Sequence, residues 1–79
     1  MERFYFDLEN GESIQDTEGT ELTSHRGACH ESLQLLGQTL RDKGGAFWND
    51  PELRLTVRDS NDLVLMRLTV FGTMAPALR

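Results

Sequence analysis

Two stretches at opposite ends of this 79-residue chain alternate between apolar and polar residues, and this pattern constrains the fold more than any other feature. Between residues 3 and 8 every second residue is apolar, starting at Phe4, and between residues 52 and 58 the same period starts at Leu53. A period of two is typical of a strand with one buried face. The sequence therefore predicts a sheet that is built from both ends of the chain.

Turn-forming residues follow the first alternating stretch. The Asn10-Gly11 pair tolerates the positive φ angles of a tight hairpin turn, so a short second strand is predicted over residues 13–15, with Ile14 facing inward. Residues 16–19 form a second predicted turn, because an aspartate can accept bonds from its own backbone and Gly19 allows left-handed geometry. Residues 20–22 add a short extended segment.

One helix is predicted between residues 25 and 42. Ser24 is a suitable N-cap, and an apolar stripe recurs at helical spacing in Cys29, Leu33, Leu36 and Leu40. Ala28, Ser32 and Leu35 widen this stripe. The Gly44-Gly45 pair ends the helix. After it, Phe47 and Trp48 are expected to anchor a loop to the core.

The longest predicted strand covers residues 63–71 and follows a four-residue turn over residues 59–62. One of its faces carries four apolar residues in a row, Val64, Met66, Leu68 and Val70. Its other face is apolar at three positions of five, Leu63, Leu65 and Phe71. A strand that is apolar on both faces is typical of the centre of a sheet that is covered twice.

These elements predict the α+β class: a single ββαββ domain over residues 1–71, with an antiparallel sheet and one helix packed on one face. Residues 72–79 are expected to form a flexible C-terminal tail. One helix covers only one sheet face, so the other face would expose Tyr5, Leu63, Leu65 and Phe71. A domain of this size has a thin core, and self-association covers such surface. These four residues are therefore the candidate interface of a homodimer.

Charge and cysteine content bear on location and partners. The formal net charge of −5 disfavours general binding to nucleic acid or to an anionic membrane. A single cysteine cannot form an internal disulfide, which indicates a reducing, cytoplasmic setting. The N-terminus has neither the basic nor the apolar part of a signal peptide, and the longest uncharged run, residues 68–78, is too short to cross a bilayer.

Three groups of residues could carry chemistry. His25 and Cys29 share a helix face at a spacing that suits a metal ligand pair, but His30 points elsewhere, so a structural thiol with exposed histidines competes with a small metal or redox protein. Cys29 is not expected to act as a nucleophile, because the sequence shows no third residue that would complete a catalytic group with it and a histidine. The acidic N-terminal half lacks the ligand spacing of a calcium loop and instead suits a solvated face or a basic partner.

The third group consists of arginines on the outer face of the predicted sheet, Arg54, Arg58 and Arg67. With an aromatic neighbour such as Tyr5, they could contact the backbone and bases of a nucleic acid. They could equally form ion pairs with acidic residues on neighbouring strands or on the other chain of a dimer. Both interpretations remain open at this point.

The sequence also resembles a family of proteins, mainly in its N-terminal residues. The matching residues are Arg3-Phe4-Tyr5-Phe6-Asp7-Leu8, Asn10-Gly11 and Asp16-Thr17-Glu18-Gly19-Thr20-Glu21-Leu22, with Val57-Arg58-Asp59 in the last hairpin. This pattern resembles a family of short uncharacterised proteins from rhizobia and related alphaproteobacteria, a domain of unknown function. The chain departs from it at Thr23, where the family often has Pro, and at Gly27 and Ser32, where it favours Ala. The resemblance implies no catalytic residue.

We therefore expect a non-enzymatic, cytoplasmic interaction module without a cofactor, which forms a homodimer and binds a protein partner through its outer sheet face or its acidic half. The first alternative is a regulatory protein that contacts nucleic acid through Arg54, Arg58 and Arg67. The second alternative is a small metal or redox protein that uses Cys29 and the histidines.

Overall fold

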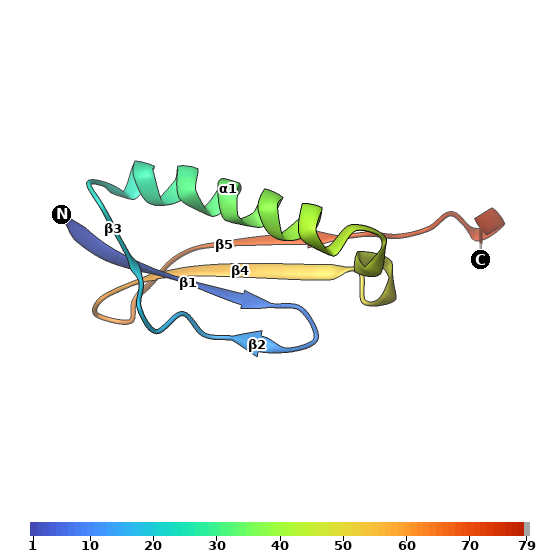
Figure 1. The fold of residues 1–79 in the computed structure, drawn as a ribbon, viewed down its shortest axis with the longest axis horizontal. Coiled ribbons are helices and arrows are strands. Elements are labelled where there is room, and N and C mark those ends of the chain that lie inside the picture. Colours follow the sequence, from blue (N-terminus) through green and yellow to red (C-terminus); the bar gives the residue numbers. More distant parts are fainter. Residues whose placement is uncertain (79) are drawn as a thin grey trace.

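The computed structural model describes residues 1–78 and confirms the α+β class, with one helix packed on one face of an antiparallel sheet (Figure 1). Its regular elements are, in chain order, β1 (Glu2–Glu9), β2 (Ser13–Ile14), β3 (Thr20–Leu22), α1 (His25–Lys43), β4 (Glu52–Asp59) and β5 (Val64–Phe71). Short 3₁₀ helices follow α1 at Gly44–Asn49 and close the described chain at Pro76–Leu78.

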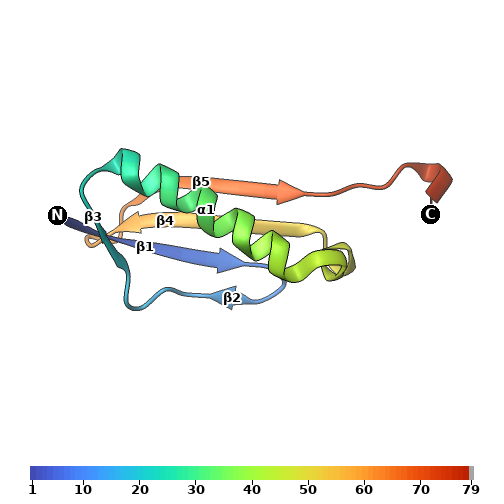
Figure 2. The same cartoon turned by 45° about the horizontal axis from the view of Figure 1, so that its top comes forward.

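The strands lie in the order β2-β1-β4-β5, and β3 pairs with the first half of β1 (Figure 2). Glu2 pairs with Leu22 in β3, and Leu8 pairs with Ile14 in β2, so two short strands share one long neighbour. The predicted hairpin turn holds at Gly11, whose φ of +74° is a conformation that glycine adopts without strain. The extended segment over residues 20–22 is thus a third strand before the helix.

The helix begins and ends where its capping residues predict. The backbone N–H of Gly27 donates to the hydroxyl of Ser24 at 3.1 Å, which satisfies one of the free donors of the first turn. At the other end, Gly44 takes a φ of +55° and its N–H donates to the Leu40 carbonyl. The last turn also carries Arg41 and Lys43, whose charges interact favourably with the helix dipole.

The core lies between α1 and the two central strands. Its buried members are Phe4 and Phe6 of β1, Ala28, Ser32 and Leu36 of α1, and Leu53, Leu55 and Val57 of β4. The predicted stripe on α1 is wrong at two positions, because Cys29 is exposed and Leu33 is 60% exposed. Ala28 and Ser32, predicted to widen the stripe, are buried against the sheet, and their small side chains let the helix lie close over β1 and β4.

The prediction that the last strand is central is also wrong, since β5 is the outermost strand beside β4. A bulge interrupts the pairing of these two strands, with Val57 opposite Met66 but Arg58 opposite Val64. The extra residue shifts the alternation, so Leu65 packs against the core while Val64 faces outward. Leu63 precedes the strand in the turn, where its N–H donates to the Asp59 carboxylate at 3.0 Å.

The structure contradicts the predicted position of Ile14 and confirms that of Phe47. Ile14 does not face inward: it is 61% exposed, because β2 is only two residues long and lies at the sheet margin. Phe47 packs against the core as expected, and the ring of Trp48 lies against Gly72 after β5. Residue 79, the end of the predicted C-terminal tail, lies outside the described residues.

Candidate interaction surface

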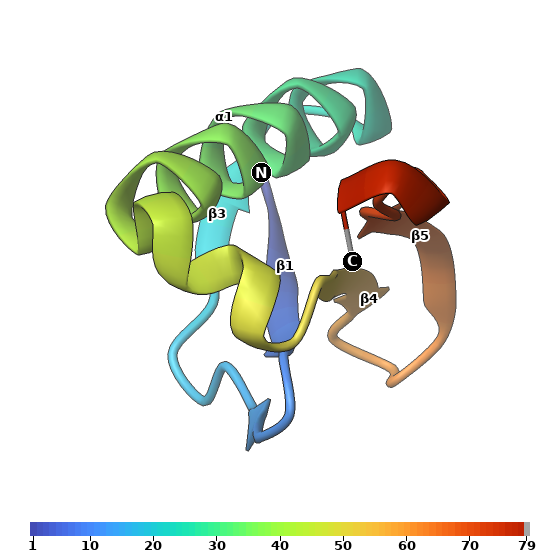
Figure 3. The same cartoon turned by 90° about the vertical axis from the view of Figure 1, so that its right-hand side faces the viewer.

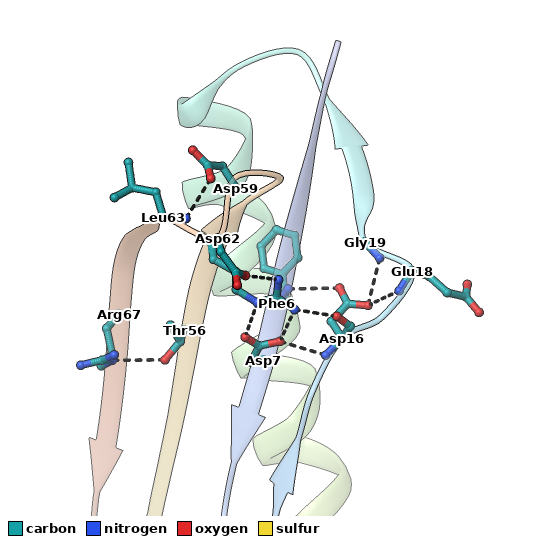
Figure 4. A network of polar contacts seen from close by, with 11 residues as sticks. Phe6, Asp7, Asp16, Glu18, Gly19, Thr56, Asp59, Asp62, Leu63 and Arg67 are labelled. Atoms are coloured by element: carbon teal, nitrogen blue, oxygen red, sulfur yellow. Dashed lines mark hydrogen bonds and ion pairs between the residues drawn. The ribbon is translucent and has the colours of Figure 1, made fainter.

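The two long edges of the sheet differ in how they are covered. On the β1 side, β3 and β2 pair with the two ends of the strand. Between them, the carboxylate of Asp16 accepts a hydrogen bond at 3.1 Å from the backbone N–H of Phe6 (Figure 4). A side chain thus takes the place of a strand at the middle of β1, and we call this edge closed because β1 has a partner at both ends and at its centre.

Asp16 also holds its own turn together. Its second carboxylate oxygen accepts the backbone N–H groups of Glu18 at 3.2 Å and Gly19 at 3.0 Å. Partial burial by itself would raise the pKa of Asp16. The hydrogen bonds from Gly19, Phe6 and Glu18, with the nearby charge of Arg58, outweigh burial and lower this pKa below its ordinary value of 3.8. The ionised form of Asp16 therefore stabilises the fold.

Arg58 connects this turn to the sheet. Its Nε donates to the Asp7 carboxylate at 2.8 Å and its Nη1 to the Asp62 carboxylate at 2.9 Å. Its Nη2 donates to the backbone carbonyl of Asp16 at 2.9 Å, and the guanidinium lies 4.6 Å from the centre of the Tyr5 ring. The hydrogen bond to Asp7 raises the pKa of Arg58 above its ordinary value. We call these five residues the Arg58 cluster.

The outer-face arginines are therefore mostly paired with acids. Arg58 is only 14% exposed at its side chain, inside its cluster. Arg54 forms looser ion pairs with Glu9 and Glu52, at 3.3 and 3.4 Å. Arg67 is exposed and its Nε donates to the Thr56 hydroxyl at 3.1 Å (Figure 4). For Arg54 and Arg58, this geometry favours the interpretation that the arginines offset acids on neighbouring strands.

The opposite edge of the sheet, along β5, is open in the described part of the chain. The N–H of Gly72 donates to the Pro51 carbonyl at 2.9 Å, so the backbone groups of residue 72 point toward β4. These groups alternate in direction along an antiparallel strand. Those of Phe71, Thr69 and Arg67 therefore point away from β4, where no other described strand pairs with them.

Apolar side chains surround this open edge. Figure 3 shows β5 beside the helix rather than beneath it. Phe71 is 68% exposed and Val64 is 49% exposed, while Met66, Leu68 and Val70 are half-buried toward the helix side. The exposed Leu33 of α1 completes the apolar border. The last acid in the sequence is Asp62, so β5 carries no negative charge.

The structure places the predicted interface residues in two locations. Leu63, Leu65 and Phe71 all lie along β5 or directly before it, although Leu65 turns toward the core. Tyr5 does not join them, because it lies on β1, on the far side of β4, in contact with Arg58. The candidate interaction surface is therefore the edge of β5, rather than the outer face of the whole sheet.

The residues proposed for metal chemistry contact other parts of the protein. The ring of His25 packs edge-on against Phe4, with centroids 5.7 Å apart, and the thiol of Cys29 lies 3.6 Å from the Met66 sulfur. Within residues 1–78, no group of three histidine, cysteine, aspartate or glutamate side chains is placed to hold a metal ion. None of the helices in that range is long and apolar enough to cross a bilayer.

The sequence reasoning missed two features of this arrangement. It assigned Asp16 to its local turn but not to the Phe6 N–H, ten residues away. It also left the partners of Arg58 unassigned, although the residues on the outer faces of the strands indicate them. Tyr5 and Asp7 share the outer face of β1, and Tyr5 is directly opposite Arg58. Once the register of β1 and β4 is known, the contact between Asp7 and Arg58 follows as a diagonal pair.

The fold and this surface define a small α+β domain with one closed and one open sheet edge. The chain belongs to the family described as a domain of unknown function (DUF6894), whose family model matches residues 3–72. The match extends from the second residue of β1 to just beyond the end of β5. No curated protein and no solved structure matches the chain.

Proposed function

We propose that this chain is a non-enzymatic protein-interaction module that binds another protein chain by strand addition at β5 and works as a homodimer. The observation that carries the proposal is the open edge of β5, an eight-residue apolar strand without an acid. A cytoplasmic location and an alphaproteobacterial origin, both inferred from the sequence, belong to the same proposal.

The contrast between the two sheet edges supports this function. Natural sheets usually cover, shorten or charge an exposed edge, because unpaired N–H and C=O groups bind other strands. This chain does so along β1, with two short strands and the Asp16 carboxylate. Along β5 the only charge is Arg67, and the strand is long enough for main-chain hydrogen bonds to hold an added strand.

The two alternatives have weaker support. Contact with nucleic acid would need several free arginines, whereas Arg58 lies inside its cluster and Arg54 is paired with acids, which leaves Arg67 as the one exposed arginine of the three without an acid partner in the described residues. A metal site at Cys29 would need several ligands that converge, but the His25 ring packs against Phe4 and no group of three ligands is placed together within residues 1–78. We therefore propose neither of these functions.

Thr69→Pro tests strand addition directly. The N–H of Thr69 points away from β4, so proline at this position removes a donor of the open edge and leaves the pairing of β4 with β5 intact. Thr69→Val is the matched control, because it keeps the N–H group and suits a strand. Light scattering over a dilution series should give a dimer for the natural chain and for Thr69→Val, and a monomer for Thr69→Pro.

Circular dichroism establishes that both variants are folded before their masses are compared. A natural chain that is monomeric at every concentration would refute the homodimer. A Thr69→Pro protein that is folded and still dimeric would show that another surface holds the two chains together, which would refute strand addition at β5.

A further inference from the structure

We propose that the strand added at β5 is the β5 strand of a second copy, antiparallel to the first, with the two-fold axis passing between the two Leu68 residues. This inference rests on the proposed function and specifies its partner and register. It follows from the facing pattern of β5, from the position of Leu33 on the helix and from the distribution of charge.

The facing pattern of β5 limits the possible registers. Residues directly opposite each other in an antiparallel pair lie on the same face of the sheet. A continuous sheet therefore needs even-numbered residues of β5 opposite even-numbered ones, because Leu68 and Val70 face the helix side whereas Phe71 faces outward. Two such registers bring seven residues of each eight-residue strand opposite one another. One is centred on Arg67 and the other on Leu68.

Charge decides between these two registers. A two-fold axis at Arg67 would place two arginines directly opposite each other, and like charges in that position are destabilising. An axis at Leu68 pairs leucine with leucine and places each Arg67 opposite the partner's Thr69. The backbone groups of Arg67 and Thr69 both point away from β4, so these residues can exchange two hydrogen bonds across the axis. In this register the alternation matches for residues 66–70 of both strands; at each end Phe71 reaches the partner's bulge, where the Leu65 side chain turns toward the core.

The helix gives an independent indication of the same centre. Cys29 and Met66 are in contact at 3.6 Å, which fixes the level of α1 relative to β5. The helix and β5 run in the same direction (Figure 1). Leu33 follows Cys29 by four residues, which is a rise of about 6 Å along the helix. Leu68 follows Met66 by two residues, which is about 6.6 Å along the strand. Leu33 therefore lies at the level of Leu68, the proposed axis.

This position explains why Leu33 faces away from its own core. In a continuous two-fold sheet, both helices lie on the same face, one on each side of the axis. Leu33 and the partner's Leu33 then border the paired Leu68 residues from both sides. The apolar side chains that are only half-buried in one chain, Met66, Leu68 and Val70, become the centre of a shared core.

The charge distribution suits a second copy as the occupant. Eight of the thirteen acids occur in the first 31 residues, which form β1, β2, β3 and the start of α1. Those three strands lie on the far side of β4 from β5. Pairing through β5 therefore keeps most of the negative charge of the two copies apart, whereas pairing through the β1 side would bring it together.

Cysteine crosslinking tests the register. In a Cys29→Ser background, we would compare Arg67→Cys, Leu68→Cys and Thr69→Cys under mild oxidation. Leu68 at the axis would be a non-hydrogen-bonded pair, with Cα atoms about 4.5 Å apart, which allows a disulfide. Thr69 lies diagonally from its own copy at about 7–8 Å. Leu68→Cys should therefore crosslink at least about tenfold faster than Thr69→Cys.

The possible results separate this inference from the proposed function. Fast crosslinking at Arg67 instead would overturn the Leu68 register and keep strand addition. Dimers by light scattering without crosslinking at any of the three positions would overturn β5 pairing between copies. A strict monomer that binds no second copy would overturn both this inference and the homodimer.

A second variant tests the role of the helix. Leu33→Asp should leave the single chain folded, because Leu33 is already 60% exposed, but it should raise the dimer dissociation constant at least about tenfold. Gln34→Asp is the matched control, since it adds the same charge one position along the helix, facing away from β5. Equal dissociation constants for the two variants would remove Leu33 from the interface.

Discussion

Replacing Asp16 by Asn keeps the shape of the side chain but removes its negative charge and one of its acceptor oxygens. The remaining amide oxygen can still accept from Glu18 and Gly19. The new NH₂ group then faces the N–H of Phe6, so two donors meet where a hydrogen bond existed. We expect Asp16→Asn to destabilise the fold, and the closed edge of β1 to be the site of the loss.

The magnitude follows from the bonds at this carboxylate. A hydrogen bond to a charged group contributes about 1.5–3 kcal/mol, and the site is partly exposed, so we expect a loss of about 2 kcal/mol in the free energy of unfolding. A domain of this length has a total stability of about 4–12 kcal/mol. The melting temperature should fall by about 8–16 °C. Urea and thermal unfolding, followed by circular dichroism at one fixed protein concentration, measure both quantities.

The pH dependence gives a second test of the same reasoning. The pKa of Asp16 is lower in the folded chain than in the unfolded one, so its contribution is present in full above the ordinary value of 3.8. It is lost as the pH falls through the lower, folded value. The difference in stability between the natural chain and Asp16→Asn should therefore be constant near neutral pH and shrink below about pH 4.

Glu18→Gln is the matched control, because it makes the same carboxylate-to-amide change in the same turn. The carboxylate of Glu18 points away from the network (Figure 4), so stability should change by less than about 0.5 kcal/mol. A loss below about 0.5 kcal/mol for Asp16→Asn, or a loss that stays the same at pH 2.5, would refute the assignment of the Phe6 bond.

Two further pairs of substitutions are expected to separate structural contacts from surface ones. Gly19→Ala should lower the free energy of unfolding in urea by about 2–4 kcal/mol, because φ is +73° and a Cβ atom would lie 3.0 Å from the Phe4 carbonyl oxygen. Gly37→Ala has open space around it and should raise this free energy by about 0.5–1 kcal/mol through helix propensity. If both substitutions changed the stability in the same direction, this expectation would be contradicted. Arg58→Ala should cost about 2–4 kcal/mol, but Arg54→Ala less than about 0.5 kcal/mol, in the same assay; similar losses would show that the Arg58 cluster is no stronger than a surface pair.

Local chemistry accounts for the elements that the sequence predicted correctly. The alternation that begins at Phe4, the hydroxyl of Ser24 and the left-handed Gly11 each act within a few residues of their position. Such signals require no knowledge of the rest of the fold. They therefore placed β1, the start of α1 and the first hairpin turn with errors of no more than one residue.

Features that depend on tertiary contacts were not predictable in the same way. The pattern of β5 is that of a central strand, and nothing in it shows that only β4 pairs with it. Apolar periodicity likewise placed both Leu33 and Ser32 in the stripe that faces the core, but the close approach of α1 to the sheet buries only the smaller side chain. The partners of Arg58 come from three separate segments, so their contact requires the complete register of the sheet.

The closed edge of β1 has a consequence for how far an assembly of this chain can extend. Fibrous growth requires every molecule to offer two surfaces, so that each addition leaves a new one free. Here the far margin ends in strands of two and three residues, with Asp16 bonded to the backbone between them. Pairing through β5 would use the one long open sheet edge that the described residues offer on each molecule. The molecular mass should therefore reach a plateau at two chains and should not rise further at high concentration.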